Sequence, residues 1–596
     1  MTGSIKTTVF SNRDKLAYTA IVSLWLLVNI AFWSWWTAPI HRGNPWLFWP
    51  VSFAFFYDGT FLPSMFLYYL GKMKKPKKIA ARYAKKGITK VAMITLTVPG
   101  SESIDIVERE LKALDEVKYP HDSWILVDKV HSPEIKTLAE KYNVRYFCRH
   151  DVDTWGEEKV AYWNQPIPPF KAKTKAGNVN AWIDAYGSEY SHFTQLDIDH
   201  IPVKNYLDSV LGYFSDPNVA WVQAPSVYGN LDNWTARGSV EQEFILQGPL
   251  QMGFYGATST PFIIGSHATY KMSAIQEIGG FQPTRAEDHL DTLYLAAKGY
   301  TGVFLPEIIA TGDGPETFET YLAQQFAWAY SLMQVLMFHT PKMIWKLKPQ
   351  LALQMLFCET WYPLWSMSMI VLFLSPIVAL LSNQHIAIVS FWEFMIRSAF
   401  ISVVAFIAWF WSRRWHKPQG VMLSWRGIIL HMARWAMVFN ANIQALLNVK
   451  KPYMITQKGS DSEYILNSRA LLPYLILGGL SLLANVFYLA EIKTGNTQGY
   501  LLFNLEGAFF MLIVCIIPFM LSIQRTGKSI LSNQKINLFL ILIGVYFLSV
   551  MSTYSQPAIM IALNSKENTA IASAKQAAPS EAYTINTDGL IELTNK

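Results

Sequence analysis

The chain has 596 residues, of which 51% are hydrophobic and 16% are charged, and its formal net charge is +7. It is long enough for two or three domains and too apolar to be wholly soluble. Its three cysteines, Cys148, Cys358 and Cys515, are far apart in the sequence, so neither a disulfide framework nor a zinc site is expected. The polar part has no basic stripe with interleaved aromatic residues, which argues against a nucleic-acid partner.

Two long apolar segments open the chain. Residues 17–38 carry no formal charge, and residues 46–70 carry only Asp58. Each segment is long enough to cross the hydrocarbon core of a bilayer. We therefore predict two transmembrane helices within residues 1–70. A cleavable signal peptide is not expected, because the first segment is long and the second follows it at once.

A basic stretch follows these two segments. Nine Lys and Arg residues lie between Lys72 and Lys90, and basic residues in short loops stay on the cytoplasmic side of a membrane. This rule places the basic stretch, the amino terminus and the polar residues 71–340 in the cytosol.

Strand-like and helix-like patterns alternate through residues 71–340. Strands are expected at residues 91–98, 124–127, 144–148 and 190–198, and helices at residues 104–114, 132–142 and 288–298. This alternation predicts an α/β domain with a mostly parallel sheet and helices on both faces. Ligands of such sheets bind at the carboxyl ends of the strands. Residues 151–174 have no regular pattern and are interpreted as a loop.

A pair of carboxylates lies at the end of the last of these strands. Asp197 and Asp199 are one residue apart, so in a strand they share a face and can reach one divalent cation. Mg²⁺ and Mn²⁺ accept a few carboxylates and keep positions open for substrate phosphates. An Asp-x-Asp tripeptide by itself is also typical of a solvated loop, so its context has to decide.

Further polar motifs accompany this pair along the chain. They are Asp128, Lys175-Ala176-Gly177-Asn178, Gly265-Ser266, Glu287-Asp288 and Gln324-Gln325-Phe326-Ala327-Trp328. Their order and spacing resemble the family-2 inverting glycosyltransferases, above all the processive membrane group that includes cellulose, hyaluronan and chitin synthases. The segment Tyr453-Met-Ile455-Thr456-Gln-Lys458-Gly resembles the gating-loop motif of cellulose synthases. The resemblance covers residues 91–459.

The resemblance implies a GT-A-like fold and a role for each motif. Asp197 and Asp199 would hold Mg²⁺ or Mn²⁺ against the diphosphate of a UDP-sugar, and Asp288 would be the general base that inverting transfer needs. Donor-contacting groups would be Asp128, Lys175, Asn178, Asp197 and Lys458. Acceptor-binding residues would be Glu287, Gln324, Trp328, Gly265 and Ser266, and the gating loop would include Tyr453, Ile455, Thr456 and Lys458.

Each of these residues has a plainer interpretation as well. Glu287 and Asp288 are also suited to cap the helix that begins there. Lys175 alone is typical of a solvated surface lysine, and Trp328 is equally typical of a packed core.

One position departs from the resembled family. Its motif is Gln-x-x-Arg-Trp, whereas this chain has Ala327 in the Arg position. The missing guanidinium would clamp the diphosphate in a bidentate geometry. Lys458 and Lys175 are the candidates to replace it, and the departure leaves a catalytically impaired homologue as an open alternative.

The carboxyl-terminal half contains five further apolar segments, at residues 362–381, 393–411, 471–489, 507–523 and 536–551. They complete seven predicted spans, with five in residues 341–560. Residues 421–447 are amphipathic and predict one interfacial helix, within a gating region at about 415–465. The tail, residues 561–596, is expected outside the membrane and poorly ordered. Trp361, near the third span, is suited either to stack on a sugar or to anchor a helix at the membrane surface.

The sequence therefore predicts an integral protein of a plasma or inner membrane that extends a β-linked polysaccharide processively and exports it. UDP-glucose is the first-choice donor, on the gating-loop resemblance alone. The expected partners are the nucleotide sugar, the growing glycan, membrane lipids and an accessory subunit outside the membrane. Two alternatives stay open: a non-processive transferase that acts on a lipid or a short acceptor, and a transport protein without catalysis.

Overall fold

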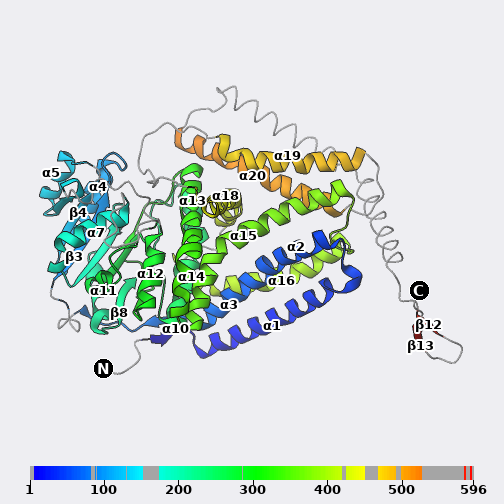
Figure 1. Ribbon diagram of the computed structural model, residues 1–596, viewed down its shortest axis with the longest axis horizontal. Helices are drawn as coiled ribbons and strands as arrows, with labels where there is room; N and C mark the ends of the chain where they lie inside the picture. Colours follow the sequence, from blue (N-terminus) through cyan, green and yellow to red (C-terminus); the bar gives the residue numbers. More distant parts are fainter. Residues whose placement is uncertain are drawn as a thin grey trace. The chain divides into compact units, whose positions relative to one another are not determined.

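The computed structural model describes residues 6–81, 88, 90–128, 130–151, 174–282, 284, 286–418, 425–449, 468–490, 499–526, 583–585 and 591–593. The chain divides into two compact units. Unit 1 comprises Met1–Thr19, Ser64–Ser366 and Ala408–Ile465, and unit 2 comprises Ala20–Pro63, Met367–Ile407 and Leu466–Lys596. Figure 1 labels the elements along the chain.

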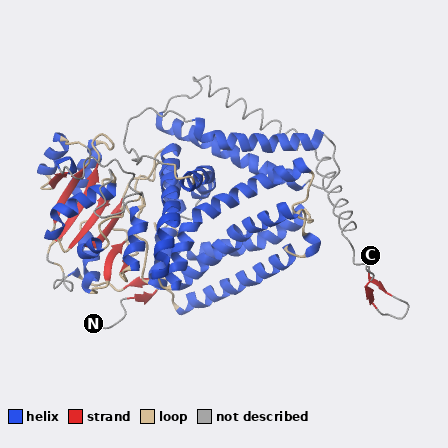
Figure 2. Cartoon of the chain, in the orientation of Figure 1, coloured by secondary structure: helices blue, strands red, loops and turns tan. Residues whose placement is uncertain are grey.

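Unit 1 contains a seven-stranded sheet with the strand order β10-β8-β9-β6-β3-β4-β5, drawn in red in Figure 2. The strands are β3 (Val91–Thr97), β4 (Asp122–Val127), β5 (Arg145–Cys148), β6 (His192–Asp197), β8 (Val219–Gln223), β9 (His267–Lys271) and β10 (Thr301–Phe304). Neighbours pair in parallel except at β9, which is antiparallel to β6 and β8. The predicted α/β domain with a mostly parallel sheet is confirmed.

Helices connect these strands as the alternation predicted. They are α4 (Ile104–Asp115), α5 (Pro133–Lys141), α7 (Lys175–Tyr186), α8 (Tyr206–Val210), α9 (Trp234–Glu243), α10 (Gln251–Thr258), α11 (Met272–Glu277), α12 (Glu287–Ala297), α13 (Phe318–Gln334) and α14 (Thr340–Met343). Helices α4 and α7 both pack against β4, and α5 packs against β5. The predicted helices at 104–114, 132–142 and 288–298 correspond to α4, α5 and α12.

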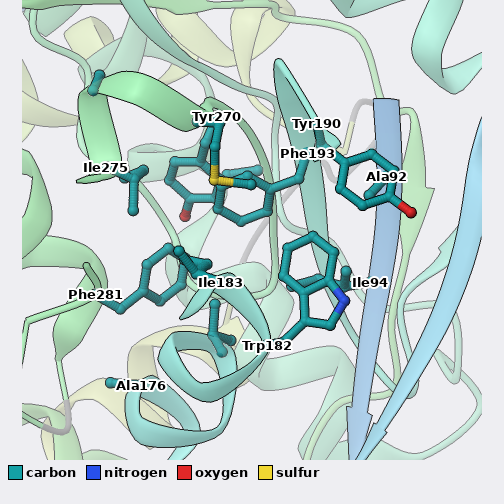
Figure 3. Close-up of a cluster of buried hydrophobic side chains, with 14 of the residues drawn as sticks. Ala92, Ile94, Ala176, Trp182, Ile183, Tyr190, Phe193, Tyr270, Ile275 and Phe281 are labelled. Atoms are coloured by element: carbon teal, nitrogen blue, oxygen red, sulfur yellow. The ribbon is translucent and has the colours of Figure 1, made fainter. Parts of the chain in front are cut away.

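An aromatic core covers one face of this sheet (Figure 3). Alternate residues of β3, Ala92 and Ile94, point into it, as the two-residue period of a strand requires. Trp182 of α7 is fully buried and lies 5.9 Å, ring to ring, from Phe193 of β6. Burial of such large side chains is the main force that fixes α7 on the sheet, and α7 begins with Lys175 at the site described below.

A small second sheet shapes the chain after the acidic strand end. Strand β7 (Ile201–Pro202) pairs antiparallel with β11 (Ala310–Thr311), in the register Ile201 to Thr311. This pairing brings the residues that follow β11 beside the residues that follow β6. Unit 1 also contains a third pair, β1 (Lys6–Thr8) with β2 (Lys74–Pro76).

The long apolar helices are α1 (Asn12–Trp36), α2 (Pro45–Phe56), α3 (Leu62–Lys72), α15 (Pro349–Ser382), α16 (Phe391–Ser412), α19 (Ser468–Ala490) and α20 (Gly499–Thr526). A π-helical turn, Tyr57–Phe61, lies between α2 and α3. Among the described residues, four helices are long and apolar enough to cross a membrane, as in a membrane protein: Asn12–Trp36, Pro349–Ser382, Phe391–Trp415 and Leu471–Tyr488. The seventh predicted span, residues 536–551, lies outside the described residues.

The charged residues that interrupt one predicted span are paired with each other. Within unit 2, Arg397 Nη2 lies 3.5 Å from Glu393 Oε1, one helical turn apart in α16. Trp35 Nε1 also donates to Glu393 Oε1 at 3.0 Å. Both charges of this helix segment therefore have partners within unit 2.

The prediction of a single interfacial helix at residues 421–447 is wrong in one respect. The described part is two helices, α17 (Trp425–Ala433) and α18 (Trp435–Leu446), which are interrupted at Arg434. The sequence has no Pro or Gly at that point, so local propensity favoured one helix. Tertiary contacts of the buried Arg434, described below, override that propensity.

Candidate active site

A cavity of about 930 Å³ lies within unit 1. It begins at the carboxyl ends of β4 and β6 and extends to residues 357–362 at the start of α15. Every predicted site residue that the structure describes lines it: Asp128, Lys175, Asn178, Asp197, Asp199, Gly265, Ser266, Glu287, Asp288, Gln324 and Trp328. The fold therefore brings these motifs to one place, whereas their roles stay predictions.

Three residues at the carboxyl end of β6 form a potential metal site. One ligand atom from each of Asp197, Asp199 and His200 lies within 4.8 Å of the other two. Two carboxylates and one imidazole are a donor set that Mn²⁺ accepts, with coordination positions left for other oxygen ligands. The residues present thus fit a divalent cation. His200 was not predicted as a ligand, although its place directly after Asp199 is the signal that could have indicated it.

The second sheet fixes the geometry of this metal site. The backbone N–H of Asp313, just after β11, donates to Asp199 Oδ2 at 2.9 Å. Gly312 leaves room for the imidazole of His200, because a Cβ atom there would come within 2.1 Å of that ring. The pairing of β7 with β11 therefore orients both Asp199 and His200.

Lys175 connects the metal site to the neighbouring carboxylates. Its Nζ lies 2.7 Å from Asp197 Oδ1 and 3.4 Å from Glu287 Oε1, and it also donates to the carbonyl oxygen of Gly265. Lys175 is the first residue of α7, whose N-cap is Thr174. The plainer interpretation as a solvated surface lysine is wrong, since only 14% of the side chain is exposed.

Glu287 and Asp288 begin α12 and face the same cavity. Asp288 Oδ2 accepts a hydrogen bond from the backbone N–H of Gly265 at 2.7 Å, and Oδ1 accepts from the N–H of His289 at 2.8 Å. Burial and the adjacent carboxylates raise the pKa of Glu287, whereas the charge of Lys175 lowers it. The N-cap of α12 is Ala286, without a side-chain cap hydrogen bond, so the interpretation of Glu287 and Asp288 as caps is wrong. Asp288 instead joins the N–H of His289 to the N–H of Gly265.

A buried ion pair lies at the carboxyl end of β4, where the cavity begins. Arg149 Nε donates to Asp128 Oδ1 at 2.5 Å, and Arg149 Nη2 donates to Asp128 Oδ2 at 2.9 Å. This bidentate geometry fixes the orientation of the carboxylate. Asn178 donates through Nδ2 to the carbonyl oxygen of Leu126 at 3.3 Å. Among the described residues its Oδ1 has no hydrogen-bond partner, although it is buried at the cavity wall.

The predicted acceptor residues lie on α13 and on the Gly265 loop. Gln324 Nε2 donates to the hydroxyl of Tyr228 at 3.4 Å, and Trp328 lies one turn further along α13 in the cavity wall. Ser266 Oγ donates to Ser226 Oγ at 2.8 Å. Trp328 is only partly buried, so the interpretation of this residue as a packed core aromatic is not supported.

The comparisons with known proteins agree with this geometry. Residues 192–412 match the family model for glycosyl transferase family group 2. This part of the chain therefore matches a family-2 glycosyltransferase domain, and relatives of the chain include cellulose synthase catalytic subunits.

Two curated relatives are cellulose synthase catalytic subunits (UDP-forming). The chain is 28% identical over 251 residues to the subunit of Komagataeibacter xylinus, over 40% of this chain and 30% of the relative. It is 32% identical over 177 residues to that of Xanthomonas axonopodis pv. citri, over 28% of this chain and 24% of the relative. The chain thus spans less than a third of the length of these relatives.

Among solved structures, a mannosyltransferase from Pyrobaculum calidifontis in complex with GDP-Man and Mn²⁺ is similar, with a TM-score of 0.42 and 16% identity over 67% of this chain and 100% of that chain. A similarity of this size carries no weight in the assignment.

Two parts of the glycosyltransferase predicted from the sequence lie outside the described residues. They are the gating-loop residues Tyr453, Ile455, Thr456 and Lys458, and most of the loop at 151–174. Lys458 therefore stays a prediction as the replacement for the missing arginine at Ala327. Lys175 is better supported, because it lies between the metal site and Glu287.

Sequence reasoning missed two groups of the glycosyltransferase besides His200. Arg149 was not linked to Asp128, because 21 residues separate them in the chain. The signal that could have linked them is that they follow the neighbouring strands β4 and β5. Glu243 and Arg434 also line the cavity. No local motif marks either of them, because they belong to helices far apart in the sequence.

Proposed function

We propose that the protein is a processive, inverting glycosyltransferase that extends a β-linked polysaccharide from a UDP-sugar at the cytosolic face and exports the product. UDP-glucose is the proposed donor. One observation carries the proposal: a single cavity connects the carboxylates after β6 with Phe357, Trp361 and Tyr362 of α15, a helix long enough to cross a membrane. A glycan extended beside Asp288 would meet that helix without leaving the cavity.

The charge of the cavity supports a requirement for a metal ion. Its described lining contains seven carboxyl side chains, from Glu102, Asp128, Asp197, Asp199, Glu243, Glu287 and Asp288, but only two permanent cations, from Lys175 and Arg434. A nucleoside diphosphate would be repelled by such a lining unless a cation neutralised it. Asp197, Asp199 and His200 would hold Mg²⁺ or Mn²⁺, which would stabilise the charge that develops on the leaving diphosphate.

The remaining residues position the reactants. Lys175 donates toward the metal side of the cavity and can contact a diphosphate oxygen. Asp288, fixed by the N–H groups of Gly265 and His289, would take the proton from the attacking hydroxyl. Gln324 and Trp328 would hold the acceptor sugar, the first by hydrogen bonds and the second through its indole face.

The membrane arrangement belongs to the proposal as well. The basic stretch from Lys72 supports a cytosolic catalytic region at residues 71–340, preceded by two spans and followed by five. Lipids would surround the spans, and an accessory subunit outside the membrane would receive the glycan. The tail at residues 561–596 would also lie outside.

The test is incubation of the purified full-length protein with UDP- and GDP-sugars in the presence of Mg²⁺ or Mn²⁺, followed by linkage analysis of the product. We expect a long β-linked polymer from a UDP-sugar. The variant Asp288→Asn should bind UDP with unchanged affinity but form no polymer. Short products from wild type would contradict processivity, and polymer formation by Asp288→Asn would contradict the assignment of the base.

A further inference from the structure

Three buried polar atoms belong to residues that line the cavity. They are Oε1 of Glu243 on α9, Oε1 of Gln324 on α13, and Nε of Arg434 at the start of α18. None of the three has a hydrogen-bond partner among the residues that the structure describes, and all three residues line the cavity. Buried polar groups of folded proteins are almost always hydrogen-bonded, so a ligand with matching groups is the expected partner.

Arg434 is held in place by neutral groups. Only 3% of the residue is exposed. Nη1 donates to Gln325 Oε1, and Nη2 lies 2.8 Å from Nδ1 of His431. The guanidinium lies 4.9 Å from the ring centre of Trp361 and 5.3 Å from that of Trp365. These contacts orient the guanidinium but leave Nε, a fixed donor, without a hydrogen-bond partner among the described residues.

Glu243 is the carboxylate that interacts electrostatically with this guanidinium. Burial raises the pKa of Glu243 to about 7, whereas the charge of Arg434 lowers it. The two groups are thus within electrostatic reach, yet no ion pair joins them among the described residues. Gln247 donates a hydrogen bond to the Glu243 carboxyl, and Gln247 itself accepts from the N–H of Ser226 at 2.9 Å. The carboxylate is therefore held near Arg434 without bonding to it.

A hydroxyl group is the chemistry that satisfies both residues at once. It donates its hydrogen to Glu243 Oε1 and accepts from Arg434 Nε, and a neighbouring hydroxyl can donate to Gln324 Oε1. A carboxylate ligand would suit Arg434, but above the raised pKa of about 7 the Glu243 carboxyl is ionised and would repel it. A purely apolar ligand would leave all three atoms without partners.

We propose that Glu243 and Arg434 form a specificity site for a neutral, hydroxylated sugar unit next to the acceptor, and that Glu243 excludes sugars that carry a carboxylate there. The inference rests on the proposed function, in which the protein itself makes the glycan. It adds to that function a preference of the cavity for neutral sugars. Gln324 and the indole of Trp361 complete the walls of this sugar site.

The experiment measures binding of two oligosaccharides to the full-length protein in detergent by isothermal titration calorimetry. One is cellotetraose, and the other is the same oligosaccharide with terminal C6 oxidised to a carboxylate. Wild type is expected to prefer cellotetraose. Arg434→Lys keeps the charge but removes Nε, and it should weaken cellotetraose binding roughly tenfold. Glu243→Gln should reduce the preference for the neutral oligosaccharide roughly tenfold or more.

A matched control is Arg426→Lys. Arg426 lies on α17, pairs with Glu241 at 3.0 Å and does not appear in the cavity wall. The Arg426→Lys variant should therefore bind both oligosaccharides as wild type does. Unchanged binding of UDP with Mn²⁺ shows that each variant is folded. The inference is overturned if wild type prefers the acidic oligosaccharide or binds neither, or if Glu243→Gln and Arg434→Lys bind both as wild type does. Release of UDP from UDP-glucose is measured separately, and its absence in wild type would refute the proposed function while the binding comparison stands.

Discussion

Replacing Lys175 with Met is expected to change metal binding and nucleotide binding in opposite directions. The ammonium of Lys175 lies 2.7 Å from Asp197 Oδ1 and 3.4 Å from Glu287 Oε1. It therefore competes with a metal ion for the Asp197 carboxylate when no nucleotide is present. When a nucleoside diphosphate is bound, the same ammonium is placed to donate to one of its oxygens.

The sizes of the two effects follow from the exposure of the pair. Asp197 is 35% exposed at its side chain, and an ion pair with such access to water is worth up to about 1 kcal/mol. Removal of the competing ammonium should thus tighten the binding of Mn²⁺ alone by roughly fivefold. A charge-assisted hydrogen bond is worth about 1.5–3 kcal/mol, so UDP binding in the presence of Mn²⁺ should weaken by about 10- to 100-fold.

The assay pairs two titrations of Lys175→Met. The electron paramagnetic resonance signal of free Mn²⁺ reports metal binding, and calorimetry with UDP at saturating Mn²⁺ reports nucleotide binding. The control is Lys141→Met, because Lys141 also pairs with a carboxylate, Glu108 at 2.7 Å, but is 58% exposed at its side chain. Neither affinity should change in the control. Unchanged UDP affinity of Lys175→Met, or a shift of both affinities in one direction, would refute the reasoning.

Three further variants test the packing around the site. Glu110→Leu should stabilise the protein by roughly 1–3 kcal/mol at pH 8, because both carboxyl oxygens of Glu110 are buried without a partner among the described residues. Burial raises the pKa of Glu110, so wild type loses stability as pH rises through that pKa. Thermal melts should therefore show a smaller gain in stability for Glu110→Leu at pH 5 than at pH 8. Gly312→Ala should weaken Mn²⁺ binding by displacing His200, since its Cβ would lie within 2.1 Å of the ring; unchanged Mn²⁺ affinity would argue against His200 as a ligand. Asp128→Ala should cost about 3–5 kcal/mol in denaturant unfolding because it leaves Arg149 buried and unpaired, and Asp128→Ala with Arg149→Met should recover most of that loss if the pair is structural.

The sequence predicted those features whose signal is local. The strand at residues 190–198 was evident from its strand-like pattern, and its end placed Asp197 and Asp199 at the carboxyl end of β6. The antiparallel β9 was not predicted, because a strand that joins the sheet from between two helices has no alternation to reveal its direction. The break at Arg434 was also missed, since only contacts with α13 and α15 pull that residue into the core.

The three atoms of the proposed sugar site illustrate the same limit. Glu243, Gln324 and Arg434 belong to α9, α13 and α18, and no spacing in the sequence relates them. Gln324 alone fell in a motif. What joins them is the packing of α17 on α9 and of α18 on α13, which is decided by apolar surfaces rather than by any pattern around the polar residues.

Asp288 lies inside the first turn of α12 and does not cap that helix, and its hydrogen bonds are compatible with the proposed role of a base. A carboxylate offers about four lone-pair positions, and the N–H groups of His289 and Gly265 occupy one on each oxygen. These two hydrogen bonds therefore fix the rotamer of Asp288 without consuming the capacity to accept a proton. Glu287, whose pKa burial raises, lies beside it and bonds to Lys175 instead. Two adjacent carboxyls thus have different surroundings, and only Asp288 combines rigid placement with open acceptor positions, which is the reason to assign the base to Asp288 rather than to Glu287.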